Sequence, residues 1–514
     1  MDKKQIAIVG AGISGLLACK YCLSKGFNPI VFESESDIGG VWAKTIKTTR
    51  LQSAKPLYQF SDFPWPSSVT DIFPTQQQTL DYLRSYATHF DLIPHIKFHS
   101  RVNGISFNGP ISSDPWSLWN GIREPFLPEG KWNVTVHDTG NDSIQVYTVD
   151  FVILCLGRFK DVPNIPEFAA GKGPKVFQGH AIHSMDYAAM DHDKAADFVR
   201  GKRVVVVGFG KTGLDIAREC SSINGPEHPC TLVYRRDHWK LPDWSPWGIP
   251  LTHLYLNRFS ELLVHKPGEG FLLSLVATLL SPLRWGVSKL VESHIKKKLP
   301  LAKYNMVPQE SFSKEARSSL IIYLPDSDDF FNAIEKGSIK LKKTPRFSFY
   351  DNGIVIEKDN THIEADIVIF ATGFKGVEKL KDIFESPTFR HFIVDSPRVP
   401  LYRECIHPRI PQLAVIGFSD SLSNIYTSEM RSKWVAALLE GAFKPPSVDE
   451  MQKDIEGWDE YMKESAGEYH YRSSIAALEI WYNDQLCKDM GMNPLRKNGL
   501  LANLFEPHGP MDYA

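Results

Sequence analysis

Gln5-Ile6-Ala7-Ile8-Val9-Gly10-Ala11-Gly12-Ile13-Ser14-Gly15 decides the fold of this chain. Residues 5–9 predict a short buried strand, and the three glycines after it have the G-x-G-x-x-G spacing of a turn that opens into a helix. A second apolar strand, residues 29–32, ends in Glu33. Strand, glycine turn, helix, strand and acid in this order are typical of a Rossmann-like dinucleotide-binding unit.

Each part of this turn has a physical task in holding a dinucleotide. Gly10 permits the tight turn, Gly12 lets a pyrophosphate approach the backbone, and Gly15 lets the helix pack closely on the strand. Glu33 would accept the ribose hydroxyls and repel a 2′-phosphate, which favours FAD or NAD over NADP. A double glycine at 39–40 fits backbone lying along a flat ring, although a plain turn is the alternative. The expected cofactor contacts are Gly10, Ala11, Gly12, Ile13, Ser14, Gly15, Glu33, Gly40, Val41 and Trp42.

A second unit of the same kind begins near residue 203. Residues 203–207 predict a β-branched buried strand, and residues 231–234 predict the next one. That strand ends in Arg235 and Arg236 where the first unit has an acid, and paired guanidinium groups suit the 2′-phosphate of NADPH. A solvated basic strand end is the alternative. The expected contacts in the turn are Gly208, Phe209, Gly210, Lys211, Thr212 and Gly213.

The two units also close alike, which indicates an internal duplication. Residues 150–157 and 366–374 both read acid, buried apolar run, small residue, glycine. The predicted fold is therefore α/β, with two Rossmann-like domains and the second inserted in the first. We expect an FAD domain at 1–160 and 375–514 and an NADPH domain at 161–374. A mostly helical insertion at about 244–316 would cover the substrate site, touch a membrane or serve packing alone.

Composition limits the class of protein. The chain has 514 residues, with 58 Lys and Arg against 60 Asp and Glu, and this balance argues against a nucleic-acid-binding surface. Seven scattered cysteines favour a reducing compartment, and no metal site is expected. The longest apolar run, residues 271–280, is too short to span a bilayer. We expect a soluble cytoplasmic protein; surface contact with a membrane through 271–290, at the cytosolic face of the endoplasmic reticulum, is the open alternative. Oligomeric state is not predicted.

Two classes of enzyme use two dinucleotides in this way, and the cysteines separate them. A disulfide reductase needs a redox dithiol beside the flavin, soon after the first ribose acid. No cysteine occurs between Glu33 and His137, and Cys19 and Cys22 lie on the helix after the first glycine turn. A monooxygenase needs NADPH, a flavin and a dry pocket, and no cysteine.

The segment between the units carries a longer signature. Phe177, Gly179, His183 and Tyr187 fit F-x-G-x-x-x-H-x-x-x-Y. With both glycine turns, residues 60–66 and residues 371–374, this signature resembles the class B flavin-containing monooxygenases from end to end. In detail the chain is most similar to the plant branch, whose members include N-hydroxylases of a cyclic amino acid.

The resemblance implies a mechanism and several residue roles. NADPH would reduce FAD, O₂ would add to form a flavin C4a-hydroperoxide, and a nucleophilic nitrogen of a small amine or amino acid would take the distal oxygen. The four signature residues would order the hinge that keeps the nicotinamide nucleotide over the flavin, with His183 orienting and not transferring a proton. Many members have an Asn near the flavin where this chain has Gln52, so no firm catalytic residue is assigned and Gln52 is the candidate.

Two further points stay open at this level. Asn424, Thr427 and Ser428 precede a predicted helix over 429–439, whose N-terminus would either stabilise charge on a reduced flavin or be an ordinary cap. S-oxygenation of a thioether and oxidative decarboxylation of a 2-oxo acid, as in auxin synthesis, share every motif with N-oxygenation. A nucleotide-binding flavoprotein sensor is the non-enzymatic alternative, and the intact glycines and paired arginines argue against it.

Overall fold

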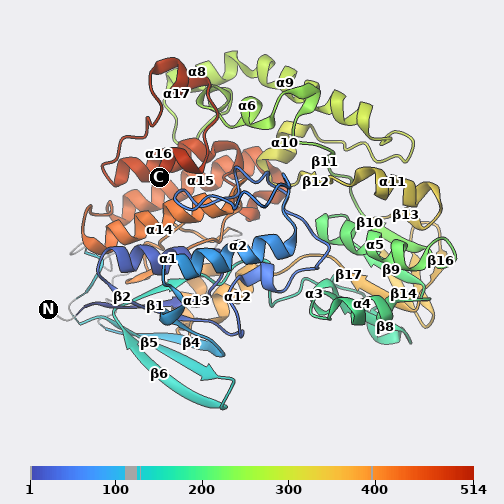
Figure 1. Cartoon of the computed structure of the whole chain (residues 1–514), viewed down its shortest axis with the longest axis horizontal. Coiled ribbons are helices and arrows are strands. Elements are labelled where there is room, and N and C mark those ends of the chain that lie inside the picture. The colour runs from blue at the N-terminus through green and yellow to red at the C-terminus, as the bar shows by residue number, and fades with distance from the viewer. Residues whose placement is uncertain (1–2, 110–123, 128, 395–397) are drawn as a thin grey trace.

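Two five-stranded parallel sheets organise the molecule, and they are built alike (Figure 1). The computed structural model describes residues 3–109, 124–127, 129–394 and 398–514. The first sheet has the order β18 (Leu413–Val415), β7 (Phe151–Leu154), β1 (Gln5–Val9), β2 (Asn28–Phe32) and β3 (Ile96–Lys97). The second has the order β8 (His180–His183), β17 (Ile367–Phe370), β9 (Val204–Val207), β10 (Cys230–Tyr234) and β13 (Ile339–Lys343).

Alternation along β1 explains the layers around the first sheet. Ile6 and Ile8 point to one face and join the core formed with α1 (Ile13–Ser24) and α14 (Asn424–Glu440). Ala7 and Val9 point to the other face. There they pack with an antiparallel sheet of β4 (Ser100–Asn108), β5 (Lys131–Asp138) and β6 (Ser143–Val149).

The second sheet repeats this arrangement. Val204 and Val206 on β9 face the core that holds α5 (Lys211–Asn224) and α11 (Ser327–Glu335). Val205 and Val207 face a second antiparallel sheet of β14 (Phe347–Tyr350), β15 (Gly353–Ile356) and β16 (Thr361–Glu364). Since β8 to β17 all lie between β7 and β18 in sequence, the second Rossmann-like unit interrupts the first, and the predicted fold class is confirmed.

Helices make up most of the remaining structure. Around the two sheets lie α2 (Gln76–His89), α3 (Ser184–Ala188), α4 (His192–Val199), α12 (Gly376–Asp382) and α13 (Pro387–Val394). The insertion holds α6 (Leu251–Tyr255), α7 (Arg258–Leu262), α8 (Phe271–Leu279), α9 (Ser281–Lys298) and α10 (Phe312–Arg317), between the short strands β11 (Lys240–Leu241) and β12 (Ile322–Tyr323). The C-terminal part adds α15 (Val448–Ala466), α16 (Glu479–Asp489) and α17 (Leu500–Phe505).

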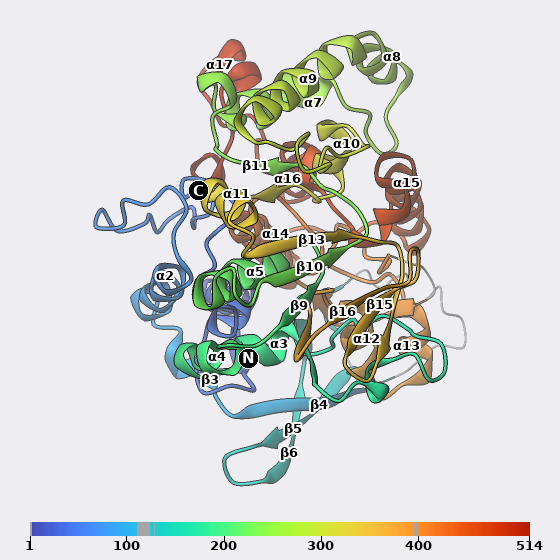
Figure 2. The same ribbon diagram turned by 90° about the vertical axis from the view of Figure 1, so that its right-hand side faces the viewer.

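Buried charges fasten the insertion to the C-terminal helices. The Glu261 carboxylate on α7 accepts hydrogen bonds from the backbone N–H groups of Ile480 and Trp481, both at 2.8 Å, and so caps the N-terminus of α16. Arg258 on α7 binds both carboxylate oxygens of Asp484 on α16. The side chains of α7 therefore tie the insertion to α16. Figure 2 shows α7, α8, α9 and α17 together at one end of the molecule.

Candidate dinucleotide sites and the cleft between them

The first glycine turn needs glycine at two positions for steric reasons. Gly10 has a φ of +104°, and a Cβ there would stand 2.6 Å from the carbonyl oxygen of Cys155 at the end of β7. A Cβ at Gly15 would stand 1.8 Å from the carbonyl oxygen of Gly10. Both contacts are far inside van der Waals range, so α1 can start against the ends of β1 and β7 only without these side chains.

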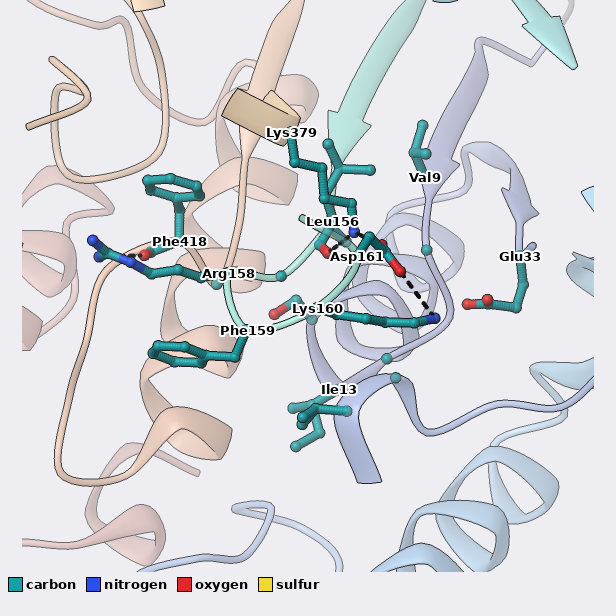
Figure 3. A pocket seen from close by; sticks show the side chains of 18 of the residues that line it. Val9, Ile13, Glu33, Leu156, Arg158, Phe159, Lys160, Asp161, Lys379 and Phe418 are labelled. Atoms are coloured by element: carbon teal, nitrogen blue, oxygen red, sulfur yellow. Dashed lines mark hydrogen bonds and ion pairs between the residues drawn. The ribbon is translucent and has the colours of Figure 1, made fainter. Parts of the chain in front are cut away.

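A cavity of about 370 Å³ opens at this turn, at the carboxyl ends of the strands of the first sheet (Figure 3). Gly12 and Gly40 form its floor, where a Cβ on Gly40 would stand 3.1 Å from the Cα of Gly12. The predicted residues that line it are Gly10, Gly12, Ile13, Ser14, Glu33, Gly40, Val41 and Trp42. Ala11 and Gly15 do not line it and support the turn from behind.

Glu33 stands at the end of β2 on the wall of this cavity. Its carboxylate accepts hydrogen bonds from the backbone N–H groups of Ala11 at 2.7 Å and Glu35 at 3.0 Å. Trp42 is fixed from the other side, where its indole N–H donates to the Tyr58 hydroxyl at 2.9 Å. Backbone, acid and ring thus hold fixed positions around the cavity.

The helix expected over 429–439 begins earlier than predicted, at Asn424, so Thr427 and Ser428 lie within its first turns and not before it. The sequence predicts a later start because Asn, Thr and Ser are typical of loops. The apolar residues between them, which the helix buries, were not given weight. Asn424 and Ser428 line the first cavity, and Thr427 is buried. The N-terminus of α14 therefore points into the cavity wall, where its positive dipole end favours negative charge.

A buried carboxyl group braces this helix start. Glu479, the first residue of α16, accepts hydrogen bonds from the Thr427 hydroxyl at 2.7 Å and from the Ser423 backbone N–H at 3.3 Å. Burial raises the pKa of Glu479 to about 7. The Ser423 hydroxyl donates to the carbonyl oxygen of Leu57, which ties the same turn to the loop before Tyr58.

The second glycine turn reproduces the first. Gly208 has a φ of +128°, and a Cβ there would stand 2.3 Å from the carbonyl oxygen of Ala371 at the end of β17. A Cβ at Gly213 would stand 2.4 Å from the carbonyl oxygen of Gly208. A Cβ at Gly210 would meet no protein atom within 4 Å. The space beside this residue is therefore open, and packing does not require a glycine there.

A wider cavity of about 1470 Å³ surrounds this second turn. The predicted residues that line it are Gly208, Phe209, Gly210, Lys211, Thr212, Arg235, Arg236 and Gln52; Gly213 lies behind. The guanidinium of Arg236 forms an ion pair with Glu468 and donates to the Tyr469 hydroxyl at 2.9 Å. Lys211 is paired with buried Asp215 on the next turn of α5.

The residues of the linker signature pack at the edge of the second sheet. A Cβ at Gly179 would stand 2.4 Å from both the Asp366 carbonyl oxygen and the Phe177 ring. His183 contacts the carbonyl oxygen of Gly373 through Nε2 at 3.0 Å, and its Nδ1 accepts the Met185 N–H at 3.2 Å. Burial lowers the pKa of His183, so the ring is a neutral link that orients residue 373 at the cavity.

Tyr187 extends the signature to α5. Its buried hydroxyl donates to Glu219 at 3.0 Å, and the other carboxylate oxygen of Glu219 accepts the Thr48 hydroxyl from the first unit at 3.0 Å. The signature therefore lies where the linker, the second unit and a loop of the first unit meet.

The two cavities adjoin. Val41, Phe159, Lys160 and Asp161 line both of them, so both glycine turns open toward one cleft. Sequence reasoning did not single out residues 159–161, although they lie in the loop that follows β7, at the edge where parallel strands bind ligands. Lys379, which also lines the first cavity and donates to the Leu156 carbonyl oxygen at 2.7 Å, has no signal in the sequence.

The thiols of the first helix take no part in this cleft. Cys19 and Cys22 are both buried in the core under α1. Burial raises the pKa of the Cys19 thiol to about 12, which opposes thiolate chemistry.

Two glycine turns of the dinucleotide-binding type on one cleft, the first with Glu33 and the second with Arg235 and Arg236 at the end of the next strand, fit a two-cofactor flavoprotein oxidoreductase. The family described as flavin-binding monooxygenase-like matches residues 3–505 of the sequence. The chain belongs to this family: it is an NADPH-dependent flavin monooxygenase with FAD and NADPH as cofactors.

One relative is similar in sequence, and two solved structures are similar in fold. The probable flavin-containing monooxygenase 1 of Arabidopsis thaliana is 41% identical over 524 residues, which cover 100% of this chain and 96% of that protein. A structure of oxidized steroid monooxygenase bound to NADP is similar with a TM-score of 0.67 at 18% identity, covering 95% of this chain and 98% of that one. The S-allyl-L-cysteine S-oxygenase from Allium sativum is similar with a TM-score of 0.59 at 17% identity, covering 96% and 89%.

Proposed function

We propose that this monooxygenase oxygenates a nucleophilic nitrogen of a small amine or amino acid. One atom of O₂ goes to the nitrogen, the other leaves as water, and NADPH supplies the two electrons that the balance needs. When bound, FAD supplies the oxygen-activating chemistry, so the protein has to bind, orient and exclude water. The observation that carries the proposal is that both glycine turns open toward one cleft lined jointly by residues 41 and 159–161.

In this proposal the residues of the first cavity hold FAD. The N–H groups after Gly10 and the start of α1 bind the pyrophosphate, as both features favour anions. Glu33, whose carboxylate accepts the Ala11 N–H, would also accept the ribose hydroxyls. Trp42, fixed by Tyr58, and the N-terminus of α14 flank the flavin ring. The positive end of the α14 dipole would favour negative charge on a flavin held there.

The wider cavity holds NADPH and leaves room for a substrate. Arg235 and Arg236 receive the 2′-phosphate, and the turn from Gly208 to Gly213 receives the pyrophosphate. His183 fixes residue 373 at the cavity wall through its hydrogen bond and transfers no proton. Gln52 is exposed on the loop tied to α14 by the Ser53 hydroxyl, which donates to Leu422. The side-chain amide of Gln52 could donate a hydrogen bond to the oxygen atom that goes to the substrate.

The preference for nitrogen rests on the similarity to the plant branch of the family, and sulfur is the alternative. The Allium sativum protein of similar structure is named as an S-oxygenase, and the cleft residues described above favour neither atom.

The experiment is a substrate panel with direct product detection. The purified enzyme, reconstituted with FAD, is given NADPH and O₂ with amines, amino acids, thioethers and 2-oxo acids in turn. We expect one amine or amino acid to gain one oxygen atom by mass spectrometry, in proportion to the NADPH consumed. A sulfoxide product or release of CO₂ would replace the proposal with the corresponding alternative. Protein that cannot be reconstituted with FAD would overturn the enzymatic assignment as well.

A further inference from the structure

The end of the molecule that holds α8 and α17 presents an unusual concentration of exposed apolar side chains. On α8, Phe271 and Leu272 are 80% and 75% exposed, and on α17, Leu500 and Leu501 are 81% and 72% exposed. Helices α8, α9 and α17 also expose Leu273, Leu275, Val276, Leu279, Leu283, Trp285 and Phe505. A concentration of exposed apolar side chains on a folded chain marks a site of contact.

Segments far apart in sequence build this surface together. The rings of Phe259 on α7 and Phe505 on α17 lie 5.2 Å apart, and α7 also packs against α8. Figures 1 and 2 both place α8, α9 and α17 along one end of the molecule, away from the two sheets. We call the exposed apolar residues of α8, the start of α9 and α17 the apolar end.

The lengths of α8 and α9 and the bend between them indicate helices that lie on a surface and do not cross a bilayer. Among the described residues, no single helix has both the length and the apolar character to cross a bilayer. Only α8 and α9 taken together meet both criteria, and the two helices are bent by 46° relative to each other. Ala277 is the one buried residue of α8, whereas Val291 and Ile295 anchor the far part of α9 in the core. A helix of nine residues is about 14 Å long, and a bilayer core is about 30 Å thick.

The charges around the apolar end select the kind of surface. Residues 265–298 carry six Lys and Arg against two Glu, whereas the whole chain is nearly balanced. Both glutamates face protein partners: Glu292 is buried and paired with Lys289, and Glu269 accepts the Lys266 N–H. Lys296, Lys297 and Lys298 are exposed at the C-terminal end of α9, the end away from α8, where Lys298 lies 3.9 Å from the Asp243 carboxylate. An exposed Trp at position 285, between apolar and basic residues, suits the headgroup level of a bilayer.

We infer that the apolar end docks on an anionic lipid bilayer, with α8 and α17 inserted about 5–10 Å into the headgroup and acyl boundary. The basic residues at the end of α9 then face anionic headgroups, each attracted by the negative surface potential that cytoplasmic leaflets carry. The inference places the protein at the cytosolic face of a membrane. It does not depend on which substrate the enzyme oxygenates.

Vesicle sedimentation with the full-length, FAD-loaded protein tests this. We expect binding to phosphatidylcholine vesicles that contain phosphatidylserine, weaker binding to phosphatidylcholine alone, and loss of the difference at high salt. The double variant Phe271→Ser/Leu272→Ser should bind about tenfold or more weakly, because two large apolar side chains no longer leave water. Leu500→Ser/Leu501→Ser tests α17 separately with the same expected direction.

A matched control uses apolar residues exposed elsewhere. Ile144→Ser/Val146→Ser changes side chains that are 66% and 61% exposed on β6, and it should bind vesicles like the unchanged protein. NADPH oxidation and FAD content report whether each variant is folded. No binding to any vesicle, or equal binding by the α8 variant and the control, overturns the inference. So does a dimer in solution that the α8 variant separates into monomers, because a second copy would then be the partner.

Discussion

At the scale of single residues, the second glycine turn requires glycine at Gly213 and Gly210 for different physical reasons. Gly213→Ala places a Cβ 2.4 Å from the Gly208 carbonyl oxygen, so α5 would have to shift away from β9. We expect a loss of about 1–3 kcal/mol in the free energy of unfolding, as for other overpacked sites. Thermal unfolding of the FAD-loaded protein measures it.

Gly210→Ala is the matched comparison in the same turn. Its Cβ meets no protein atom within 4 Å and its φ is −78°, so stability should change by less than about 0.5 kcal/mol. The new methyl group nevertheless stands where the pyrophosphate approaches the backbone, so the KM for NADPH should rise. Equal thermal stability of both variants would contradict the steric argument.

The Glu468 carboxylate would compete with the 2′-phosphate of NADPH for the guanidinium of Arg236. It forms an ion pair with Arg236, one of the two arginines proposed to receive the 2′-phosphate. Glu468→Gln removes this competing charge, so we expect the KM for NADPH to fall several-fold while the KM for NADH stays unchanged. Arg236→Ala should act in the opposite direction, by about tenfold, since a charged hydrogen bond is lost.

The control for this pair lies one turn earlier. Glu464→Gln changes an exposed carboxylate on α15 and should leave both KM values unchanged. Steady-state kinetics with NADPH and NADH check all three variants. If Glu468→Gln shifted the two KM values equally, general electrostatics and not competition for Arg236 would be the cause.

At the scale of elements, the N-terminus of α14 depends on the protonation of one buried carboxyl group. Glu479 has a pKa of about 7 in the folded state because of burial, against an ordinary value of 4.5. The folded protein thus holds the proton more tightly than the unfolded chain does. The contribution to stability is complete below pH 4.5 and is lost as the pH rises toward 7.

Glu479→Gln removes this pH dependence while keeping an oxygen that accepts from Thr427 and Ser423. Well above pH 7 the variant should be the more stable protein, by up to about 3 kcal/mol, and near pH 4.5 the two proteins should be alike. Denaturant unfolding over this pH range checks the prediction. A constant difference between the two proteins at every pH would show that the carboxyl group does not titrate in this range.

At the scale of the whole molecule, the repeated architecture was predictable and the contacts between its halves were not. Both glycine turns and their strands follow from local patterns such as residues 5–15, because strand burial and turn geometry depend on neighbours in sequence. The nesting of the second unit follows from the repeat of the pattern and from residues 375–514, which are too few for a third copy. Ion pairs such as Arg236 with Glu468 join residues 232 positions apart. Such pairs depend on how packed elements meet, and no spacing rule encodes them.

One of these long-range contacts joins the two nucleotide units through a buried carboxylate. The Thr49 hydroxyl of the first unit donates to buried Asp215 on α5 at 2.6 Å, and Asp215 also holds Lys211 of the second glycine turn. Thr49→Val leaves that carboxylate with one donor fewer at the joint between the units. Because hydride transfer requires the two rings to meet within a narrow geometry, we expect slower reduction of FAD by NADPH, by about tenfold, with FAD content unchanged.

Thr48→Val is the matched control. Thr48 is exposed, and its hydroxyl donates a hydrogen bond to Glu219 at 3.0 Å. A hydrogen bond in water contributes little, so its reduction rate should stay within about twofold of the unchanged enzyme. Anaerobic stopped-flow mixing with NADPH measures both rates directly. Equal rates in Thr49→Val and Thr48→Val would mean that the buried contact does not set the distance between the cofactors.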